Sequence, residues 1–158
     1  MKSIAVAAFI PVLLLTGCGE KTQSPCGSDE LVVSNAWVRE AGQGQPMSAA
    51  YLSICNGTNT SDRLVGASFD AANTAEIHTT TIDENNVARM ARMENGVPLP
   101  IGESTNLAPG SAHLMLIGLT DTIEIGSDPM ITLEFENAPP ITLNFEVRGR
   151  TEVGHSAH

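Results

Sequence analysis

The chain has 158 residues, which is enough for one domain of ordinary size with its own hydrophobic core. It is acidic, with 18 Asp and Glu residues against 8 Lys and Arg, and its formal net charge is -10. Such a surface repels nucleic acid and offers anionic lipids no electrostatic attraction. We therefore expect neither a nucleic-acid-binding role nor a polybasic membrane contact.

The N-terminus has the features of an export signal. In MKSIAVAAFIPVLLLTG, Lys2 precedes an apolar stretch that is too short to span a bilayer, and the stretch ends in small residues. Its end, LTGC, resembles the lipobox of bacterial lipoproteins, which implies cleavage before Cys18 and lipidation of that cysteine. We therefore predict a signal peptide over residues 1–17 and a lipid anchor at the periplasmic face of the envelope. A hydrophobic helix that stays in the fold is the alternative.

Residues 18–30 are polar and rich in turn formers, which predicts a flexible tether. With Cys18 assigned to lipid, Cys26 and Cys55 remain, and two thiols in an oxidising compartment usually pair. We predict a disulfide between them. The alternative is a thiolate copper ligand at Cys55. A blue-copper site needs His and Met soon after that cysteine, and the segment SICNGTNTSD has neither.

Short runs of β-branched and aliphatic residues follow from residue 31 onward, separated by clusters of Gly, Pro, Asn and Asp, and no helical period is sustained. Strands are expected at 31–38, 48–55, 63–69, 75–82, 87–93, 113–119, 130–136 and 141–147. The closely spaced turns predict a single all-β domain over residues 31–149, built as an antiparallel sandwich or barrel. Residues 150–158 have too little apolar content to hold them against the domain and are predicted to be a flexible tail.

The strand SAHLMLIGL carries His113 and Met115 on the same face, because side chains alternate along a strand. Core packing is one explanation, and a soft-metal site of nitrogen and sulfur ligands is the other. His78 lies in AEIHTTTI, and the turn DENN predicts a hairpin that returns through VARMARM. That hairpin would bring Met90 or Met93 near His78, but the two methionines face opposite sides of a regular strand.

These residues resemble the signature of the periplasmic copper chaperones of the PCu(A)C type, which is a His, a Met and then a His-x-Met pair. His78, Met90, His113 and Met115 follow this order, with 11 and 22 residues between them, each interval one residue longer than the family's usual one. The segments AWVRE, SAAYLSI, DRLVGA and PGSAHLMLIGL are also similar. The resemblance implies a cupredoxin-like Greek-key β-barrel that binds one Cu(I) through two imidazoles and two thioethers, with Met93 as the fallback ligand.

The function that the resemblance implies is a monomeric Cu(I) metallochaperone. Its acceptor would be the dinuclear copper site, CuA, in subunit II of cytochrome c oxidase, reached directly or through a thiol-disulfide copper chaperone. Thioethers suit an oxidising compartment, where paired thiolates would be lost to disulfides. The tail histidines His155 and His158 could hold Cu(II) as a secondary site, or they could be incidental.

Catalysis is not expected, because the chain has no nucleophile elbow, no H-E-x-x-H helix and no phosphate-binding glycine loop. The rival interpretation is a non-catalytic β-sandwich lipoprotein for adhesion or assembly, in which the His and Met residues only pack. A blue-copper electron carrier is disfavoured by the missing Cys ligand. Trp37, Tyr51 and Met47 are expected to belong to the core. The alternatives are an aromatic ring beside a metal site for Trp37 or Tyr51, and a further sulfur ligand for Met47.

Overall fold

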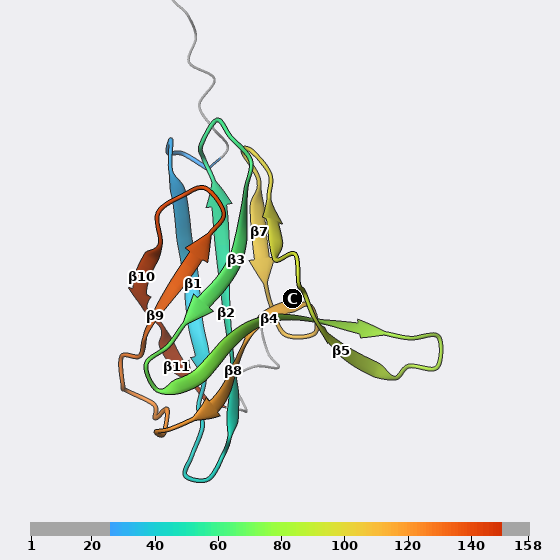
Figure 1. Ribbon diagram of the computed structural model, residues 1–158, viewed down its shortest axis with the longest axis vertical. Coiled ribbons are helices and arrows are strands. Elements are labelled where there is room, and N and C mark those ends of the chain that lie inside the picture. The colour runs from blue at the N-terminus through green and yellow to red at the C-terminus, as the bar shows by residue number, and fades with distance from the viewer. Residues whose placement is uncertain (1–25, 150–158) are drawn as a thin grey trace, which may run out of the picture.

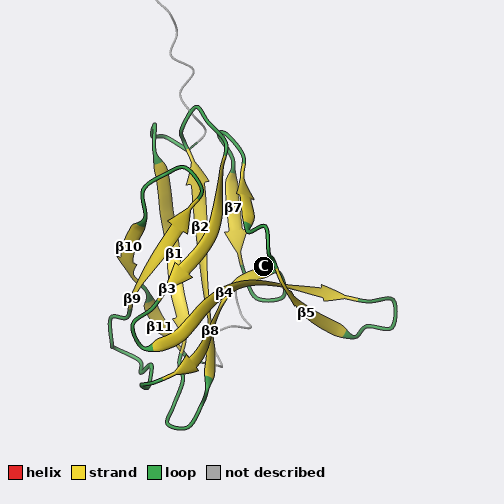
Figure 2. Cartoon of the chain, in the orientation of Figure 1, coloured by secondary structure: helices red, strands yellow, loops and turns green. Residues whose placement is uncertain are grey.

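The computed structural model describes residues 26–149, and these residues fold into eleven β-strands with no helix (Figures 1 and 2). The strands are β1 (Leu31–Arg39), β2 (Met47–Asn56), β3 (Asp62–Ser68), β4 (Ala72–Ile82), β5 (Ala88–Arg92), β6 (Val97–Leu99), β7 (Ser104–Leu107), β8 (Ala112–Leu119), β9 (Met130–Phe135), β10 (Ile141–Asn144) and β11 (Glu146–Arg148). In this described part, nothing qualifies as a helix able to cross a membrane. The signal peptide, Cys18, and the tail with His155 and His158 lie outside the described residues.

The strands form one connected sheet in the order β10-β9-β3-β4-β8-β2-β1-β11, with β5 paired to β4, β6 to β3 and β7 to β2. Strands that are neighbours in this order are often distant in sequence, so long crossovers connect them. Pairing is antiparallel except between β1 and β11, where Trp37 lies opposite Glu146 in a parallel register. Because β10 and β11 end the order, the curled sheet is an open sandwich rather than a closed barrel.

The core lies inside the curled sheet and follows the alternation of side chains along the strands. One cluster holds buried side chains from strands at both ends of the sheet order, which ties the two layers together. Its members with no exposed surface are Val38, Ala50, Ile54, Leu64, Leu114, Leu116, Ile131, Leu133 and Phe145. The residues between them along each strand face outward, and the candidate site is built from that outer face.

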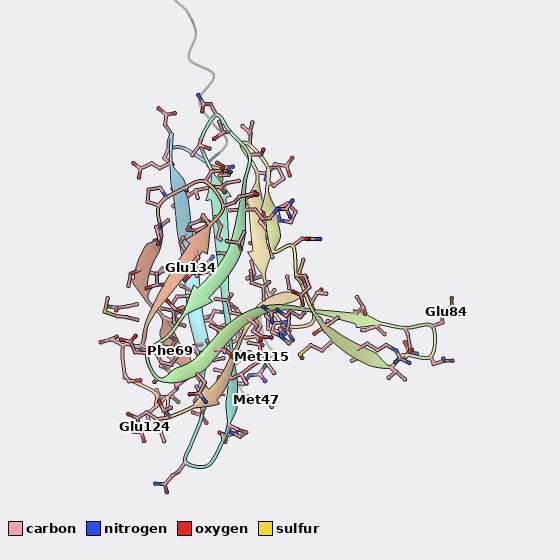
Figure 3. The ribbon with its side chains drawn as sticks, in the orientation of Figure 1. Met47, Phe69, Glu84, Met115, Glu124 and Glu134 are labelled. Carbon is pink, nitrogen blue, oxygen red and sulfur yellow. A yellow bond between two sulfur atoms is a disulfide. The ribbon has the colours of Figure 1, made fainter. Side chains whose placement is uncertain are left out.

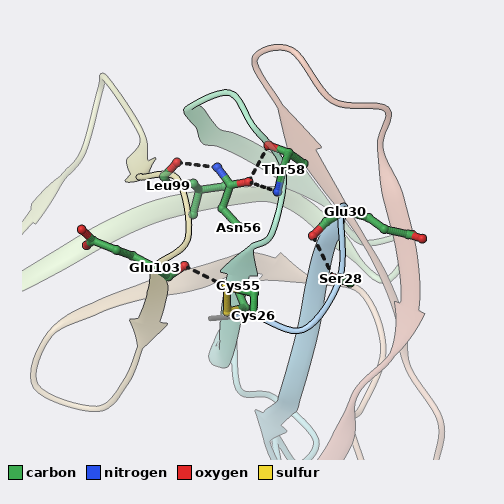
Figure 4. The surroundings of a disulfide bond; sticks show 8 residues. All are labelled: Cys26, Ser28, Glu30, Cys55, Asn56, Thr58, Leu99 and Glu103. Atoms are coloured by element: carbon green, nitrogen blue, oxygen red, sulfur yellow. Dashed lines mark hydrogen bonds between the residues drawn. A yellow bond between two sulfur atoms is a disulfide. The ribbon is translucent and has the colours of Figure 1, made fainter. Parts of the chain in front are cut away.

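A disulfide joins Cys26 to Cys55, the pair predicted from the sequence, and attaches the segment before β1 to the end of β2 (Figure 4). The next residue, Asn56, is fully buried; its amide donates to the Leu99 carbonyl, and its side-chain oxygen accepts from the Thr58 backbone N–H. The bonded state of Cys55 contradicts the alternative of a thiolate copper ligand at that position, because a disulfide sulfur is not a thiolate.

The β4–β5 hairpin extends away from the body of the sandwich as an arm (Figure 1). Its turn is organised by Asp83, whose Oδ1 accepts the backbone N–H groups of Asn85 and Val87. Asn86 takes up a positive φ of 58°, a conformation that Asn tolerates better than most side chains. The predicted return of VARMARM beside AEIHTTTI is confirmed, and the register places Met90 opposite Thr80.

Candidate metal centre

His78 and His113 are direct cross-strand partners on β4 and β8. Opposite residues in an antiparallel pair point to the same side of the sheet, so the two imidazoles share its outer face. Their ring centres are 6.3 Å apart. Met115 follows on that same face of β8, since it lies two residues beyond His113, and Glu76 is its partner on β4. The register therefore gathers both predicted imidazoles and one predicted thioether.

An open pocket of about 320 Å³ lies on this face and contains three of the four predicted ligands among its lining, Met90, His113 and Met115. Met90 reaches it from the hairpin arm, and the other two come from β8. Met47 of β2 also lines the pocket, and Figure 3 shows Met47 and Met115 on the same part of the molecule. The remaining lining residues are Arg39, Glu40, Ser48, Ala49, Tyr51, Thr80, Pro109 and Gly110.

Within residues 26–149, hydrogen bonds leave one ring nitrogen of His78 and one of His113 without a partner. The Nδ1 of His113 lies 2.9 Å from the carbonyl oxygen of Ser111, so Nδ1–H donates there and Nε2 keeps its lone pair. The Nε2 of His78 lies 2.9 Å from a carboxylate oxygen of Glu76, and its Nδ1 is buried with no partner. Metal-bound histidines have the same arrangement, with the other ring N–H given to a carbonyl or a carboxylate.

The distance between the two rings is slightly longer than a shared ion requires. A metal–nitrogen bond is about 2.0 Å long and the nitrogen lies roughly 1.1 Å from the ring centre, so one ion can join rings whose centres are at most ~6 Å apart, and about 5 Å apart at a tetrahedral angle. The observed separation of 6.3 Å exceeds both values. The two imidazoles would therefore have to move closer by about 1 Å to share a four-coordinate ion.

Glu76 holds His78 in this orientation and is itself held by Arg92, whose Nη1 lies 3.1 Å from its second oxygen. The hydrogen bond from His78 lowers the pKa of Glu76; burial opposes this shift, and the positive charge of Arg92 adds to it. Glu76 is therefore an anionic acceptor at neutral pH. Its position two residues before His78, on the same strand face, is the sequence signal that could have identified it.

Met90 and Met93 lie on opposite sides of the hairpin arm, as expected from their spacing. Met90 is 52% exposed and lines the pocket. Met93, the predicted fallback ligand, packs instead against the main core cluster, and its backbone N–H donates to the Ile77 carbonyl. Of the two thioethers, only that of Met90 reaches the site face in this structure.

Trp37 and Tyr51 belong to the buried core, as expected, whereas Met47 does not. The two aromatic residues form a small core cluster of their own with Ala49, beside the site. The ring centres of Trp37 and Tyr51 are 4.3 Å apart, and that of Tyr51 is 6.1 Å from His113. Met47 is 47% exposed, because it occupies the outer face of β2 together with Ala49 and Tyr51. The core assignment of Met47 was wrong.

Nitrogen and carboxylate ligands, without the thioethers, do not form a metal site on this face. Within residues 26–149, no group of three or more His, Cys, Asp or Glu side chains is placed to hold an ion. A metal bound at this face would therefore need the thioethers as well as the imidazoles. That donor set favours a soft ion.

The fold is that of the PCuAC domains, with their cupredoxin-like β-sandwich. The copper-bound PCuAC domain from PmoF2 superposes with a TM-score of 0.65 and 22% identity over 76% of this chain and 93% of that one. The solution structure of CuI-DR1885 from Deinococcus radiodurans gives a TM-score of 0.59 and 24% identity over 74% of this chain and 76% of that one.

The chain belongs to the LpqE-like family, because the family model described as "Putative lipoprotein LpqE-like" matches residues 31–147. A relative from Leifsonia xyli subsp. xyli (strain CTCB07), named "Putative lipoprotein Lxx21020", is 34% identical over 142 residues. That match covers 87% of this chain and 82% of the relative.

Proposed function

We propose that this protein is a Cu(I)-binding metallochaperone of the bacterial cell envelope. The observation that carries the proposal is the gathering of His78, His113, Met90 and Met115 on one outer sheet face, where the last three line an open pocket and His78 lies directly opposite His113. Each imidazole has one nitrogen that no group of the described residues occupies. Four such ligands form a complete coordination shell for one ion.

The chemistry of the four ligands suits a copper ion that is carried and released rather than one that is bound permanently as a cofactor. Thioether sulfur is soft and imidazole is borderline, so the set favours Cu(I) over harder ions. None of the four carries a negative charge when bound, so they give no extra stabilisation to Cu(II). Thioethers also stay available where thiols pair, and the disulfide of Cys26 and Cys55 illustrates that pairing. An open pocket allows an acceptor's ligands to replace them one at a time.

Lipid anchoring at Cys18, after removal of residues 1–17, is proposed from the sequence motif and is supported by the lipoprotein names of the family and the relative. The structural neighbours, of which one is a copper-bound domain and one a CuI-loaded protein, support copper as the metal. We propose the periplasmic face of the envelope as the location and a monomer as the working form.

As acceptor we propose the CuA site of cytochrome c oxidase subunit II, supplied directly or through a thiol-disulfide copper chaperone. A mixture of Cu(I)-loaded protein and the soluble CuA domain should develop the absorption of the dinuclear centre, without free copper in solution. Transfer only after addition of a reduced thiol partner would assign delivery to the indirect route. Absence of transfer by either route would contradict this acceptor.

The copper site is tested by competition between the anaerobic protein and a colorimetric Cu(I) chelator. We expect the protein to withhold about one equivalent of Cu(I). His113→Ala and Met115→Ala should each withhold much less, whereas Met130→Ala, which removes a 58% exposed methionine from β9, should behave as wild type. No competition by the wild type would favour the metal-free adhesion or assembly module. Intense visible colour with Cu(II) would favour a blue-copper carrier.

We also propose a secondary Cu(II) site at His155 and His158, from the sequence alone, and it is tested with a chain that ends at Gly149. Loss of His155 and His158 should remove Cu(II) binding and leave Cu(I) retention unchanged, because the two sites share no residue. Equal Cu(II) binding by the full and shortened chains would contradict a role for the tail.

A further inference from the structure

Arg39 differs from the other arginines of the described chain. Residues 26–149 contain five arginines and no lysine, and four of the five are in ion pairs, Arg63 with Glu136, Arg89 with Asp83, Arg92 with Glu76 and Glu94, and Arg148 with Glu146. No carboxylate of the described residues lies within ion-pair distance of Arg39. An unpaired guanidinium stands out in a chain with a formal net charge of -10.

The guanidinium of Arg39 lies at the copper pocket and uses few of its donors. Its Nη2 donates to the Tyr51 hydroxyl at 3.2 Å, and its Nε–H is covered and has no acceptor in the described chain. Arg39 lines the same pocket as Met115 and His113. Buried or half-buried guanidinium groups normally pair with carboxylates through their planar fork of donors.

The strand register explains why there is room beside Arg39. Val38 lies opposite Ala50, so the continued register brings Arg39 level with Ala49 of β2. Ala49 in turn lies opposite Met115 on β8. The small methyl side chain of Ala49 therefore lies between Arg39 and Met115. Because this side chain is short, the space over it forms part of the pocket.

Of the residues that the structure describes, only one other charged residue lines this pocket, Glu40, and it makes no ion pair with Arg39. Glu76 lies on β4, beyond Met115, where His78 and Arg92 already occupy both of its oxygens. No local carboxylate is therefore positioned to neutralise Arg39. The ligands assigned to Cu(I) carry no charge, so a bound ion would add a further positive charge on the same face.

We propose that Arg39 binds a carboxylate group at the rim of this pocket, and that carboxylate and Cu(I) favour each other's binding. The coupling rests on the proposed copper function, but the carboxylate site itself does not. A carboxylate offsets both the guanidinium charge and the charge of the ion, and linkage makes the effect reciprocal. The carboxylate comes either from a free organic acid or from an Asp or Glu side chain of the copper acceptor. In the second case the acceptor holds the loaded protein more tightly than the empty one.

The carboxylate site is tested on the copper-free protein by titration with acetate at constant ionic strength, followed by NMR of the arginine Nε–H signals. The Arg39 signal should shift and saturate, while that of Arg63 on β3 stays constant. Arg39→Lys keeps the charge but loses the planar fork, so binding should be several-fold weaker; Arg39→Gln should abolish it. Trp37, the single tryptophan, gives a second readout through its contact with Tyr51. An Arg39 signal that does not respond would overturn the proposal.

The coupling is tested by repeating the titration with Cu(I)-loaded protein, with chloride as the control anion. Acetate should bind several-fold more tightly than to the copper-free protein, and equal affinity would overturn the coupling. A blocked Gly-Glu-Gly peptide that binds more tightly than acetate would assign the site to an acceptor side chain, and equal binding would assign it to free carboxylates. If the protein retains no Cu(I) but the copper-free protein still binds acetate, the proposed function fails and the carboxylate site stands.

Discussion

The two faces of β8 carry different kinds of side chain. Leu114 and Leu116 point inward, have no exposed surface and belong to the main core cluster. His113 and Met115, on the alternate positions, point outward and line the pocket. The same contrast holds on β4, where Ile77 is buried in the core and His78 lies on the site face.

This contrast shows how a small sandwich accommodates stability and binding in the same strands. The inner positions can be optimised for packing without changing the ligands, because neighbouring side chains point in opposite directions. The outer positions can carry polar and sulfur ligands, since they lie outside the main core cluster even where, as at His113, the side chain is buried. Substitutions on the two faces should therefore produce separable effects.

The largest effect on stability is expected for Leu114→Ala. This residue lies between the two ligands of β8 but packs in the core, so its truncation should lower the free energy of unfolding by about 2–5 kcal/mol. Denaturant unfolding followed by circular dichroism measures the loss. The folded variant should still retain one equivalent of Cu(I). Loss of Cu(I) by a fully folded variant would show that the faces are coupled.

On the outer face, Glu76→Gln should weaken Cu(I) binding by about 10–100-fold, as is typical when the carboxylate behind a metal-bound histidine is removed. The amide can offer either oxygen or N–H to His78, so the ring nitrogen that faces the site is no longer fixed. Thermal stability should change little, because ion pairs near the surface contribute little.

Glu94→Gln is the matched control for this substitution. Glu94 lies 3.6 Å from Arg92, the same arginine that pairs with Glu76, but it makes no hydrogen bond to His78. Its loss should leave chelator competition unchanged. An equal loss of Cu(I) affinity in both variants would assign the effect to general charge and not to the orientation of His78.

The two methionines of the hairpin also contrast an outward-facing side chain, Met90, with one that packs on the core, Met93, and their substitution should have smaller effects. Met90→Ala should weaken Cu(I) retention roughly tenfold and leave the unfolding free energy nearly unchanged, because half of its surface is exposed. Met93→Ala should do the reverse and cost about 1–2 kcal/mol, because Met93 packs on the core. Chelator competition measures the loss of Cu(I) affinity in both variants, and denaturant unfolding measures their loss of stability. The opposite pattern would identify Met93 as the ligand.

Much of the fold was predictable because local patterns determine it. Alternation and turn residues indicated the strands, and the expected hairpin of β4 with β5 is confirmed. The pairing of β1 with β11 was not expected, since parallel neighbours far apart in sequence leave no local signal.

The site was less predictable than the fold, because it depends on the register between distant strands. The spacing of His113 and Met115 placed them on one face, but no local pattern places His78 directly opposite His113. The partners of these residues were also missed. Glu76 and Arg39 lack any motif of their own, and Met47 was assigned to the core because strand residues with apolar side chains usually belong there.

Two carboxylates show the same difference between a residue of the candidate site and a residue with a structural role. Glu76 accepts a hydrogen bond from a candidate ligand, whereas Asp62, at the start of β3, accepts backbone N–H groups and the side-chain amide of Asn137. The backbone N–H groups are those of Arg63, Asn137 and Ala138. Burial raises the pKa of Asp62, but these hydrogen bonds outweigh burial and hold the pKa below its ordinary value.

The pH dependence of stability should identify this structural role. Because the folded pKa of Asp62 lies below the unfolded value of about 3.9, its contribution is complete above that value and is lost as pH falls through the folded pKa. The difference in unfolding free energy between wild type and Asp62→Asn should therefore be constant near neutral pH and shrink below about pH 4. Its size should stay under about 1 kcal/mol, since the group is partly solvated. Urea titrations from pH 6 downward measure it, and a difference that persists into strong acid would mean that the lost hydrogen-bond geometry, not the charge, accounts for the effect.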